Sequence, residues 1–358
     1  MDNHLPQIIG NTPLLHLRKI SELTGCHIYG KAEFMNPGGS VKDRTALGII
    51  QAAVAAGELE PGGVVVEGTA GNTGIGLTIV ANAMGFESVV VMPQGASKEK
   101  IDQVEMLGAE LILVPSVRYD NPQHYIHTAE KVAAGRAHQE DHGAIWARQF
   151  DNPANTRIHY DTTGQEIWQQ TDGKVDGFIC SVGTGGTVAG VAEALREKNP
   201  NVKIGVADPM GSGVYTHFTE GTPRCEGSSI VEGVGVSFVP GNLADVEVDF
   251  ACQVSDEEAL PYIYDLLKEE GLCVGGSAGV NIAGAVRLAQ ELGPGHTIVT
   301  ILCDSGARYA SKLFNPEFLW QHKRTRLHRA RAKLREALEQ AEADPAVRTR
   351  LLANFAEA

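Results

Sequence analysis

Short apolar runs alternate along this chain with segments in which apolar residues recur at the spacing of a helix. Continuous apolar runs bounded by turn residues are typical of strands buried on both faces, as in a parallel sheet. The intervening segments have the length and periodicity of helices that cover such a sheet. Strands are therefore predicted over residues 63–66, 88–92, 110–114, 177–182, 202–207 and 297–303, and helices over 72–84, 98–107, 187–198, 257–270 and 279–292.

The alternation falls into two series, which a polar stretch around residues 136–156 separates. Strands that alternate with helices predict an α/β fold of two domains, each a mostly parallel twisted sheet flanked by helices, with a cleft between them. We place the N-terminal domain at residues 1–155 and the C-terminal domain at residues 156–320. Apolar residues at helical spacing also predict a helical tail over residues 321–358, folded back on its own domain or on a dimer partner.

The formal net charge of -14 over 358 residues argues against general nucleic-acid binding, which requires a basic face. No apolar run reaches the roughly 18 residues of a membrane span, and the N-terminus lacks the pattern of a signal peptide. The 6 cysteines show no C-x-x-C spacing, so reduced thiols in a cytoplasmic protein are the simple interpretation. His138 and His142 do not match a zinc-protease motif, and we predict no metal site.

Residues 183–187 (GTGGT) follow a predicted strand and precede a predicted helix. Glycines allow successive backbone N–H groups to point into one concavity, and a helix N-terminus adds positive potential, so this turn is a candidate phosphate site. It matches neither a P-loop nor a complete dinucleotide fingerprint, because the sixth position counted from Gly183 is Val188. Asp208 could still bind the ribose of a dinucleotide, and a glycine-rich packing turn is a further alternative.

Two more glycine-rich turns precede predicted helices. In residues 67–77 (EGTAGNTGIGL), Thr69, Asn72 and Thr73 add side-chain donors to the backbone N–H groups, which suggests a carboxylate site beside the phosphate site. Taken alone, this turn could equally cap a helix. Ser277 also precedes a predicted helix and is more simply interpreted as its N-cap.

Lys42 follows a turn over residues 36–40 (NPGGS) and precedes helix-forming residues. A lysine is usually a solvated surface charge, but one placed directly after such a turn could point into a cleft. A lysine, a phosphate site and a carboxylate site together suggest pyridoxal phosphate and an amino-acid substrate. Such a lysine would hold the cofactor as an imine, with its pKa lowered by desolvation and by the cationic ring. The ring would delocalise the substrate carbanion.

Several motifs occur between residues 7 and about 320 in a recognisable order: IIGNTPLLHL, NPGGSVKDR, EGTAGNTGIGL, QFDNPAN, VGTGGT, GGSAG and RYASKLFNP. In these motifs the chain resembles the cysteine synthase and cystathionine β-synthase group of pyridoxal-phosphate enzymes. The resemblance implies the tryptophan synthase β-like fold (fold type II), with pyridoxal 5'-phosphate in the interdomain cleft. It also implies that an early segment of the N-terminal domain crosses to the other domain.

The resemblance assigns roles to individual residues. Lys42 matches the catalytic Schiff-base lysine, Asn72 the residue that binds the cofactor 3′-oxygen, and Ser277 the partner of the pyridine nitrogen. Independently of the resemblance, residues 303–305 end a predicted strand that faces the cleft, so Cys303 is expected in the core and Asp304 near the ring nitrogen. The cofactor phosphate is expected at Gly183, Thr184, Gly185, Gly186 and Thr187. The substrate carboxylate is expected at Thr69, Ala70, Gly71, Asn72, Thr73 and Gln149.

The family implies a β-replacement reaction in a homodimer. O-acetyl-L-serine, or a similar activated serine, would react with sulfide through α-aminoacrylate to give L-cysteine and acetate. Ala70 departs from the family, because cysteine synthases usually have a serine there. Residues 67–68 and 231–235 resemble the cystathionine β-synthase branch more closely.

Alternatives to sulfide as the nucleophile therefore stay open. Homocysteine could react instead, with Glu232 meeting its ammonium group, to give cystathionine. Water would make the protein an L-cysteine desulfhydrase. A catalytically idle binding module is a different class of protein, and the intact lysine and phosphate loop argue against it.

Overall fold

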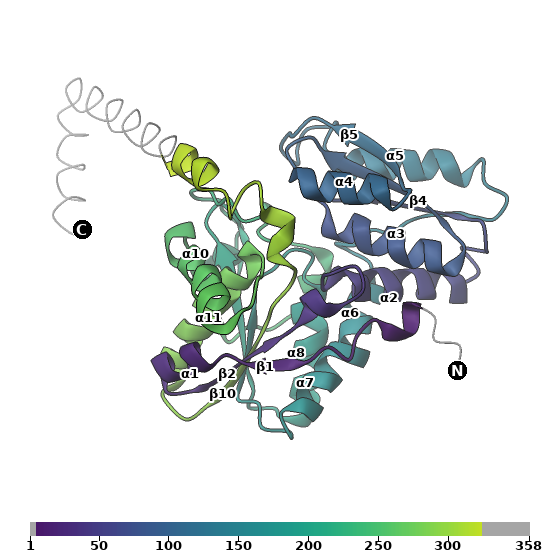
Figure 1. The fold of residues 1–358 in the computed structure, drawn as a ribbon. Coiled ribbons are helices and arrows are strands. Elements are labelled where there is room, and N and C mark those ends of the chain that lie inside the picture. Colours follow the sequence, from purple (N-terminus) through teal and green to yellow (C-terminus); the bar gives the residue numbers. More distant parts are fainter. Residues whose placement is uncertain (1–4, 324–358) are drawn as a thin grey trace. The chain divides into compact units, whose positions relative to one another are not determined.

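The computed structural model describes residues 5–323, so residues 1–4 and 324–358, with most of the predicted helical tail, lie outside it. The chain divides into two units at Arg308, and residues 5–308 form the first, which contains nearly all of the described structure (Figure 1). The second unit begins at Tyr309. The first unit contains both β-sheets and every predicted site residue. In the described part of the second unit, residues 316–323 are helical.

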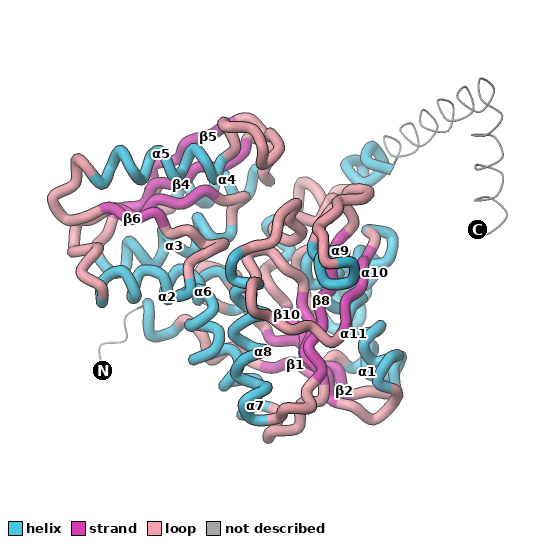
Figure 2. The backbone as a smooth tube through the Cα atoms, turned by 180° about the vertical axis from the view of Figure 1, so that it is seen from behind, coloured by secondary structure: helices cyan, strands magenta, loops and turns pink. Residues whose placement is uncertain are grey.

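The larger sheet draws its strands from both ends of the first unit (Figure 2). Its strands, in spatial order, are β1 (Leu14–His16), β2 (His27–Lys31), β10 (Thr297–Ile301), β7 (Gly177–Cys180), β8 (Lys203–Pro209) and β9 (Phe250–Val254). All neighbouring pairs are parallel except β1 and β2. Because Ile28 of β2 pairs with Ile298 of β10, an early segment completes a sheet built from the second half of the chain.

The smaller sheet is parallel throughout. Its strands, in spatial order, are β5 (Glu110–Val114), β4 (Glu87–Pro93), β3 (Val64–Gly68) and β6 (Ala144–Trp146). Val64 and Val66 of β3 pack in one core cluster with α5 (Tyr125–Ala137). Val65 packs on the other side, with α2 (Lys42–Ala55) and α3 (Asn72–Met84). A strand covered by helices on both faces needs the continuous apolar run that the sequence shows.

The other helices cover the larger sheet or connect the two sheets. α11 (Gly276–Leu292) packs against β7, β8, β9 and β10, and α8 (Gly186–Lys198) against β7. α2 packs against both α3 and α6 (Pro153–Ile158), and α6 in turn packs against α8, so these helices join the parts of the first unit. The remaining helices are α1 (Arg18–Thr24), α4 (Lys98–Met106), α7 (Gln165–Gln170), α9 (Val214–Glu220) and α10 (Asp256–Asp265).

The predicted α/β class and the mostly parallel sheets are confirmed. Every predicted strand is present, with small shifts at its ends. The sequence pattern missed β1, β2, β6 and β9, which are short or carry polar residues such as His27 and Lys31 of β2. The domain limits at residues 155 and 320 stay predictions, since residues 1–308 form one compact unit. Within the described residues, no helix combines the length and the apolar character needed to cross a bilayer.

Candidate active site

One pocket in the first unit brings together loops from both sheets. Of the residues that the sequence predicted, the pocket is lined by Lys42, Thr69, Ala70, Gly71, Asn72, Thr73, Gln149, Gly183, Thr184, Gly185, Thr187 and Ser277. Gly186 is the predicted residue that does not line it. A Cβ at Gly186 would lie 2.4 Å from Asn155 Oδ1.

Lys42 is the first residue of α2 and follows the turn over residues 36–40. Its backbone N–H donates to Ser40 Oγ at 3.2 Å, and Gly39 in the turn adopts a φ of +77°, which favours glycine. Burial lowers the pKa of the Lys42 ammonium, and Cys303 and Asp304 oppose this effect. A lysine whose pKa is lowered in this way is a better nucleophile and base at neutral pH.

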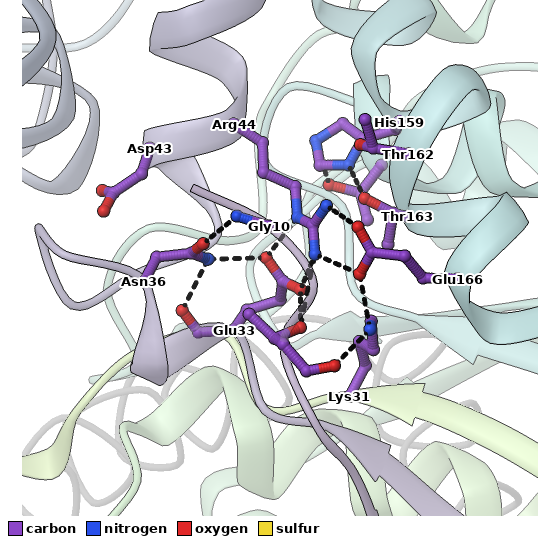
Figure 3. A network of polar contacts seen from close by, with 12 residues as sticks. Gly10, Lys31, Glu33, Asn36, Asp43, Arg44, His159, Thr162, Thr163 and Glu166 are labelled. Atoms are coloured by element: carbon purple, nitrogen blue, oxygen red, sulfur yellow. Dashed lines mark hydrogen bonds and ion pairs between the residues drawn. The ribbon is translucent and has the colours of Figure 1, made fainter. Parts of the chain in front are cut away.

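A buried network of charged side chains fixes the chain around this lysine (Figure 3). Arg44 donates to Glu33 Oε2 at 2.8 Å and to Glu166 Oε1 at 2.6 Å. Asn36, in the turn, donates to Glu33 Oε2 at 2.8 Å. Removing one member would leave a buried charge without its partner, which is costly. The network therefore holds both the turn and the first turn of α2 in one arrangement.

The predicted phosphate loop lies between the carboxyl end of β7 and the start of α8. Gly185 has a φ of +85°, and a Cβ at Gly183 would lie 2.5 Å from the backbone oxygen of Gly233. Both positions therefore require glycine. Thr184 and Thr187 add hydroxyl groups to the backbone N–H groups at the helix N-terminus, which is a favourable place for an anion.

The predicted carboxylate loop has the same setting at the end of β3, where α3 begins at Asn72. Thr73 Oγ1 donates to Gln149 Oε1 at 2.6 Å, and Gln149 Nε2 donates to the backbone oxygen of Gly68 at 3.1 Å. Gln149 Nε2 also lies 3.3 Å from Glu67 Oε1. Burial raises the pKa of the Glu67 carboxyl to about 8, although hydrogen bonds from Gln149 and Gly68 oppose this.

Ser277 lies in the first turn of α11, because the helix begins at Gly276. Its interpretation as the N-cap is therefore wrong: the N-cap residue is Gly275, which has no side chain to cap with. The side chain of Ser277 is instead available at the pocket wall. A serine inside the first turn of a helix, facing a cleft, is a candidate ligand contact.

Two residues after β10 were also singled out by the sequence, Cys303 as a core residue and Asp304 as a neighbour of the ring nitrogen, and the second stays a prediction. Cys303 is partly buried: it packs against the core cluster of the larger sheet and also lines the pocket. Asp304 is buried and accepts a hydrogen bond from Asn72 Nδ2 at 2.6 Å. Asn72 Oδ1 accepts from Arg308 Nη1 at 2.6 Å. Asp304 and Arg308 therefore orient the Asn72 amide, and the backbone oxygen of Asp304 accepts from the N–H of Gly275 at 3.0 Å, two residues before Ser277.

An ion pair at the pocket was missed by sequence reasoning. Lys100 Nζ on α4 lies 2.9 Å from Glu232 Oε2, and their side chains are 1% and 17% exposed. The Lys100 stem packs on the carboxylate loop, since a Cβ at Gly71 would lie 2.4 Å from Lys100 Cδ. The sequence points to Glu232, but nothing local distinguishes Lys100 from Lys98, whose side chain is 78% exposed.

The donors in this pocket fit one particular cofactor. Pyridoxal phosphate requires an amine for covalent attachment, an anion site for its phosphate and a polar partner for its ring nitrogen. Lys42, the glycine loop over residues 183–187 and Ser277 lie at one pocket and could supply these groups. The fold and the site thus define the class: an enzyme that depends on pyridoxal phosphate.

The chain belongs to the family of pyridoxal-phosphate dependent enzymes, whose model matches residues 5–304. It is 50% identical to Cysteine synthase 1 of Neurospora crassa over 318 residues, which covers 87% of this chain and 83% of that protein. The structure of an O-ureido-L-serine synthase is similar with a TM-score of 0.79 and 33% identity, over 88% of this chain and 96% of that one. That of an O-acetylserine dependent cystathionine beta-synthase from Helicobacter pylori has a TM-score of 0.77 and 32% identity, over 87% and 98%.

Proposed function

We propose that this protein is a cysteine synthase, which replaces the acetate of O-acetyl-L-serine with sulfide to give L-cysteine. The observation that carries the proposal is a half-buried lysine of lowered pKa in one pocket with two glycine loops suited to a phosphate and a carboxylate. Similarity to Cysteine synthase 1 over most of both chains supports the same reaction.

Pyridoxal phosphate supplies an electron sink for the negative charge that develops at the substrate α-carbon. Lys42 would hold the cofactor covalently through Nζ. Residues 183–187 would bind its phosphate through backbone N–H groups and two threonine hydroxyls. Ser277 would serve as the partner of the pyridine nitrogen, and Asn72 as the partner of the 3′-oxygen. A neutral hydroxyl at the ring nitrogen suits β-elimination, which does not require full protonation of the ring.

Residues 69–73 and Gln149 would bind the substrate carboxylate. Because Ala70 has no hydroxyl, this binding would depend on the backbone N–H groups of the loop and on the polar groups of Thr73 and Gln149. Once the amine of the substrate has taken its place on the cofactor, Lys42 Nζ would be free to remove the proton from the α-carbon, and the lowering of its pKa by burial favours the uncharged amine that acts as a base. Acetate leaves the β-carbon, sulfide adds there, and Lys42 returns the proton to the α-carbon.

Sulfide suits this pocket better than homocysteine because the carboxylate that could receive an amino-acid nucleophile is already paired. Glu232 lies against Lys100. To meet the ammonium of homocysteine, Glu232 would have to weaken this pair, and the ammonium of a nearly fully buried Lys100 would lose a counter-charge. Sulfide is small and needs no such contact.

The test is a competition between the two nucleophiles. Holoenzyme is incubated with O-acetyl-L-serine and equal concentrations of sulfide and homocysteine, and the products are separated and quantified. We expect mainly cysteine. Mainly cystathionine, lost in Glu232→Ala, would overturn the proposal. It would favour the second candidate, cystathionine formation, which the likeness to the Helicobacter pylori enzyme supports. Pyruvate as the main product would identify a β-eliminating desulfhydrase instead.

We also propose that the protein is a cytoplasmic homodimer, as its family resemblance suggests. Light scattering coupled to gel filtration should give twice the mass of one chain, and the mass of a single chain would contradict the dimer. Fractionation of the source cells followed by an immunoblot should find the protein with cytoplasmic markers; enrichment in an organelle fraction would contradict that location.

A further inference from the structure

The two threonines of the phosphate loop each have a buried polar side chain behind them. Asn155 Nδ2 donates to Thr184 Oγ1 at 2.9 Å, and His159 Nε2 lies 3.2 Å from Thr187 Oγ1. Both Asn155 and His159 are 0% exposed, and neither is among the residues that line the pocket. They therefore reach the two hydroxyls from the protein side of the loop.

The local structure is arranged to permit these contacts. Asn155 and His159 lie about one helical turn apart and so face the same direction. The helix changes at this point from α6, which ends at Ile158, to a π-helix over His159–Gly164. Such π segments are rare and occur frequently at functional sites. Gly190 of α8 permits the close approach, because a Cβ there would lie 2.8 Å from His159 Cβ.

Hydrogen bonds fix the orientation of the Asn155 amide. Its Oδ1 accepts from Thr45 Oγ1 at 2.9 Å, and its Nδ2 donates to the backbone oxygen of Gln149 at 2.8 Å as well as to Thr184. The Thr184 hydroxyl oxygen is therefore an acceptor toward the protein. A hydroxyl has a single proton, so Thr184 retains its proton for a partner on the pocket side.

His159 stands behind Thr187 in the same way. Burial, followed by the nearby positive charges of Arg44 and Lys42, lowers the pKa of His159 well below its ordinary value, whereas Glu166 acts in the opposite direction. The ring is thus neutral and carries one N–H. Its Nδ1 lies 2.8 Å from Thr163 Oγ1, and Figure 3 shows the ring of His159 beside Thr163. When Thr163 donates to Nδ1, the ring proton is on Nε2 and points at Thr187.

We propose that Asn155 and His159 are positioning residues of the cofactor site: they donate to the hydroxyl oxygens of Thr184 and Thr187 and thereby turn both hydroxyl protons toward the phosphate of pyridoxal phosphate. The inference rests on the proposed role of residues 183–187 as the phosphate site. Two hydroxyls oriented before binding lose less freedom when the phosphate arrives. The opposite tautomer of His159 would draw the Thr187 proton away from the phosphate.

The test compares pyridoxal phosphate with pyridoxal, which lacks the phosphate. Holoenzyme is resolved and reconstituted with each compound, and the dissociation constant is measured by absorbance titration. His159→Leu removes the ring donor at similar volume, and His159→Gln keeps an N–H donor at a corresponding position. We expect His159→Leu to weaken pyridoxal phosphate binding by about tenfold, and His159→Gln to restore most of it. The affinity for pyridoxal should hardly change in either variant.

A double-mutant cycle with Thr187→Val separates positioning from packing. If His159 acts through the Thr187 hydroxyl, His159→Leu should cause little further loss in the Thr187→Val background. The inference would be overturned if His159→Leu weakened the binding of pyridoxal phosphate and of pyridoxal equally. It would also be overturned if the losses of binding free energy in His159→Leu and Thr187→Val simply added in the double mutant. A wild-type protein that does not prefer pyridoxal phosphate to pyridoxal would instead refute the phosphate site itself. Should His159→Leu fail to fold, Asn155→Leu with Thr184→Val provides an independent cycle with the same outcomes.

Discussion

The two glycine loops of the pocket have the same local structure but are held in different ways. Each follows the end of a parallel strand and precedes a helix, β3 and α3 in one case and β7 and α8 in the other. The loop over residues 183–187 is supported by uncharged, buried donors. The loop over residues 69–73 contacts Gln149 and packs on the stem of Lys100, whose ammonium pairs with Glu232.

The difference fits what each loop is proposed to bind. Buried neutral donors do not respond to salt or to an incoming charge, which suits a cofactor that stays bound. The ion pair between Lys100 and Glu232 joins a helix of the smaller sheet to a loop beside the larger sheet. Such a pair can respond to a charged ligand, which suits a substrate that binds and leaves. Changes to the first loop should therefore alter cofactor affinity, and changes to the second should alter the handling of the amino acid.

The largest effect is expected where both loops face the same side chain, at Lys42. Lys42→Ala should lower cysteine formation by about 10³-fold or more, because it removes both the proposed attachment point and the proposed base. It should also abolish the borohydride-reducible bond between cofactor and protein, measured by peptide mapping after reduction. Lys98→Ala, at a side chain that is 78% exposed, is the control and should retain activity. Reduced cofactor on a peptide containing another lysine would contradict the assignment.

The charge sensitivity of the carboxylate loop can be tested at Glu67, which lies two residues before the loop. Burial raises the pKa of Glu67 to about 8, so the folded protein holds this proton more tightly than the unfolded chain. The resulting contribution to stability is fully present below the ordinary carboxyl pKa and is lost as pH rises from about 4.5 to about 8. Relative to Glu67→Gln, the wild-type free energy of unfolding should fall by on the order of a few kcal/mol over that interval. Urea unfolding of both proteins at several pH values measures this change. A difference in the free energy of unfolding that stays constant with pH would contradict the prediction.

Substitutions in the loop over residues 183–187 should weaken the binding of pyridoxal phosphate. Loss of one charge-assisted hydrogen bond in Thr187→Val or Thr184→Val should cost about 1.5–3 kcal/mol, which weakens pyridoxal phosphate binding roughly tenfold or more. At saturating cofactor, the KM for O-acetyl-L-serine should stay close to that of the wild type. Unchanged cofactor affinity in both variants would mean that the backbone N–H groups suffice.

The smallest effect is expected in the carboxylate loop itself. Thr73→Val removes the hydroxyl that orients Gln149, and a loss of about 1 kcal/mol should raise the KM for O-acetyl-L-serine roughly fivefold. Cofactor affinity should not change, and Thr73→Ser, which keeps the hydroxyl, should behave like the wild type. Steady-state kinetics together with a cofactor titration measure both quantities. An equal loss of cofactor affinity would remove the distinction between the two loops.

Local sequence alone determined the central strands and the glycine loops. Strands such as β3 and β4 are buried on both faces, so their continuous apolar runs identify them without knowledge of the rest of the chain. Glycine was informative where the backbone requires it: Gly71 and Gly185 have φ values of +142° and +85°. Lys42 could be identified as a candidate because a tight turn and a helix start both lie beside it in sequence.

Only the tertiary structure decided which residues lie behind and between these elements. The pairing of β2 with β10 joins segments from opposite ends of the first unit, and no local pattern encodes it. Lys98 and Lys100 look alike in sequence, yet one side chain is 78% exposed and the other 1%, because Glu232 and Gly71 approach only Lys100 in the folded chain. Asn155 likewise gains its role from a contact with Thr184 that the fold creates. Helix and strand formation follow from neighbouring residues, whereas burial and hydrogen-bond partners depend on segments that are distant along the chain.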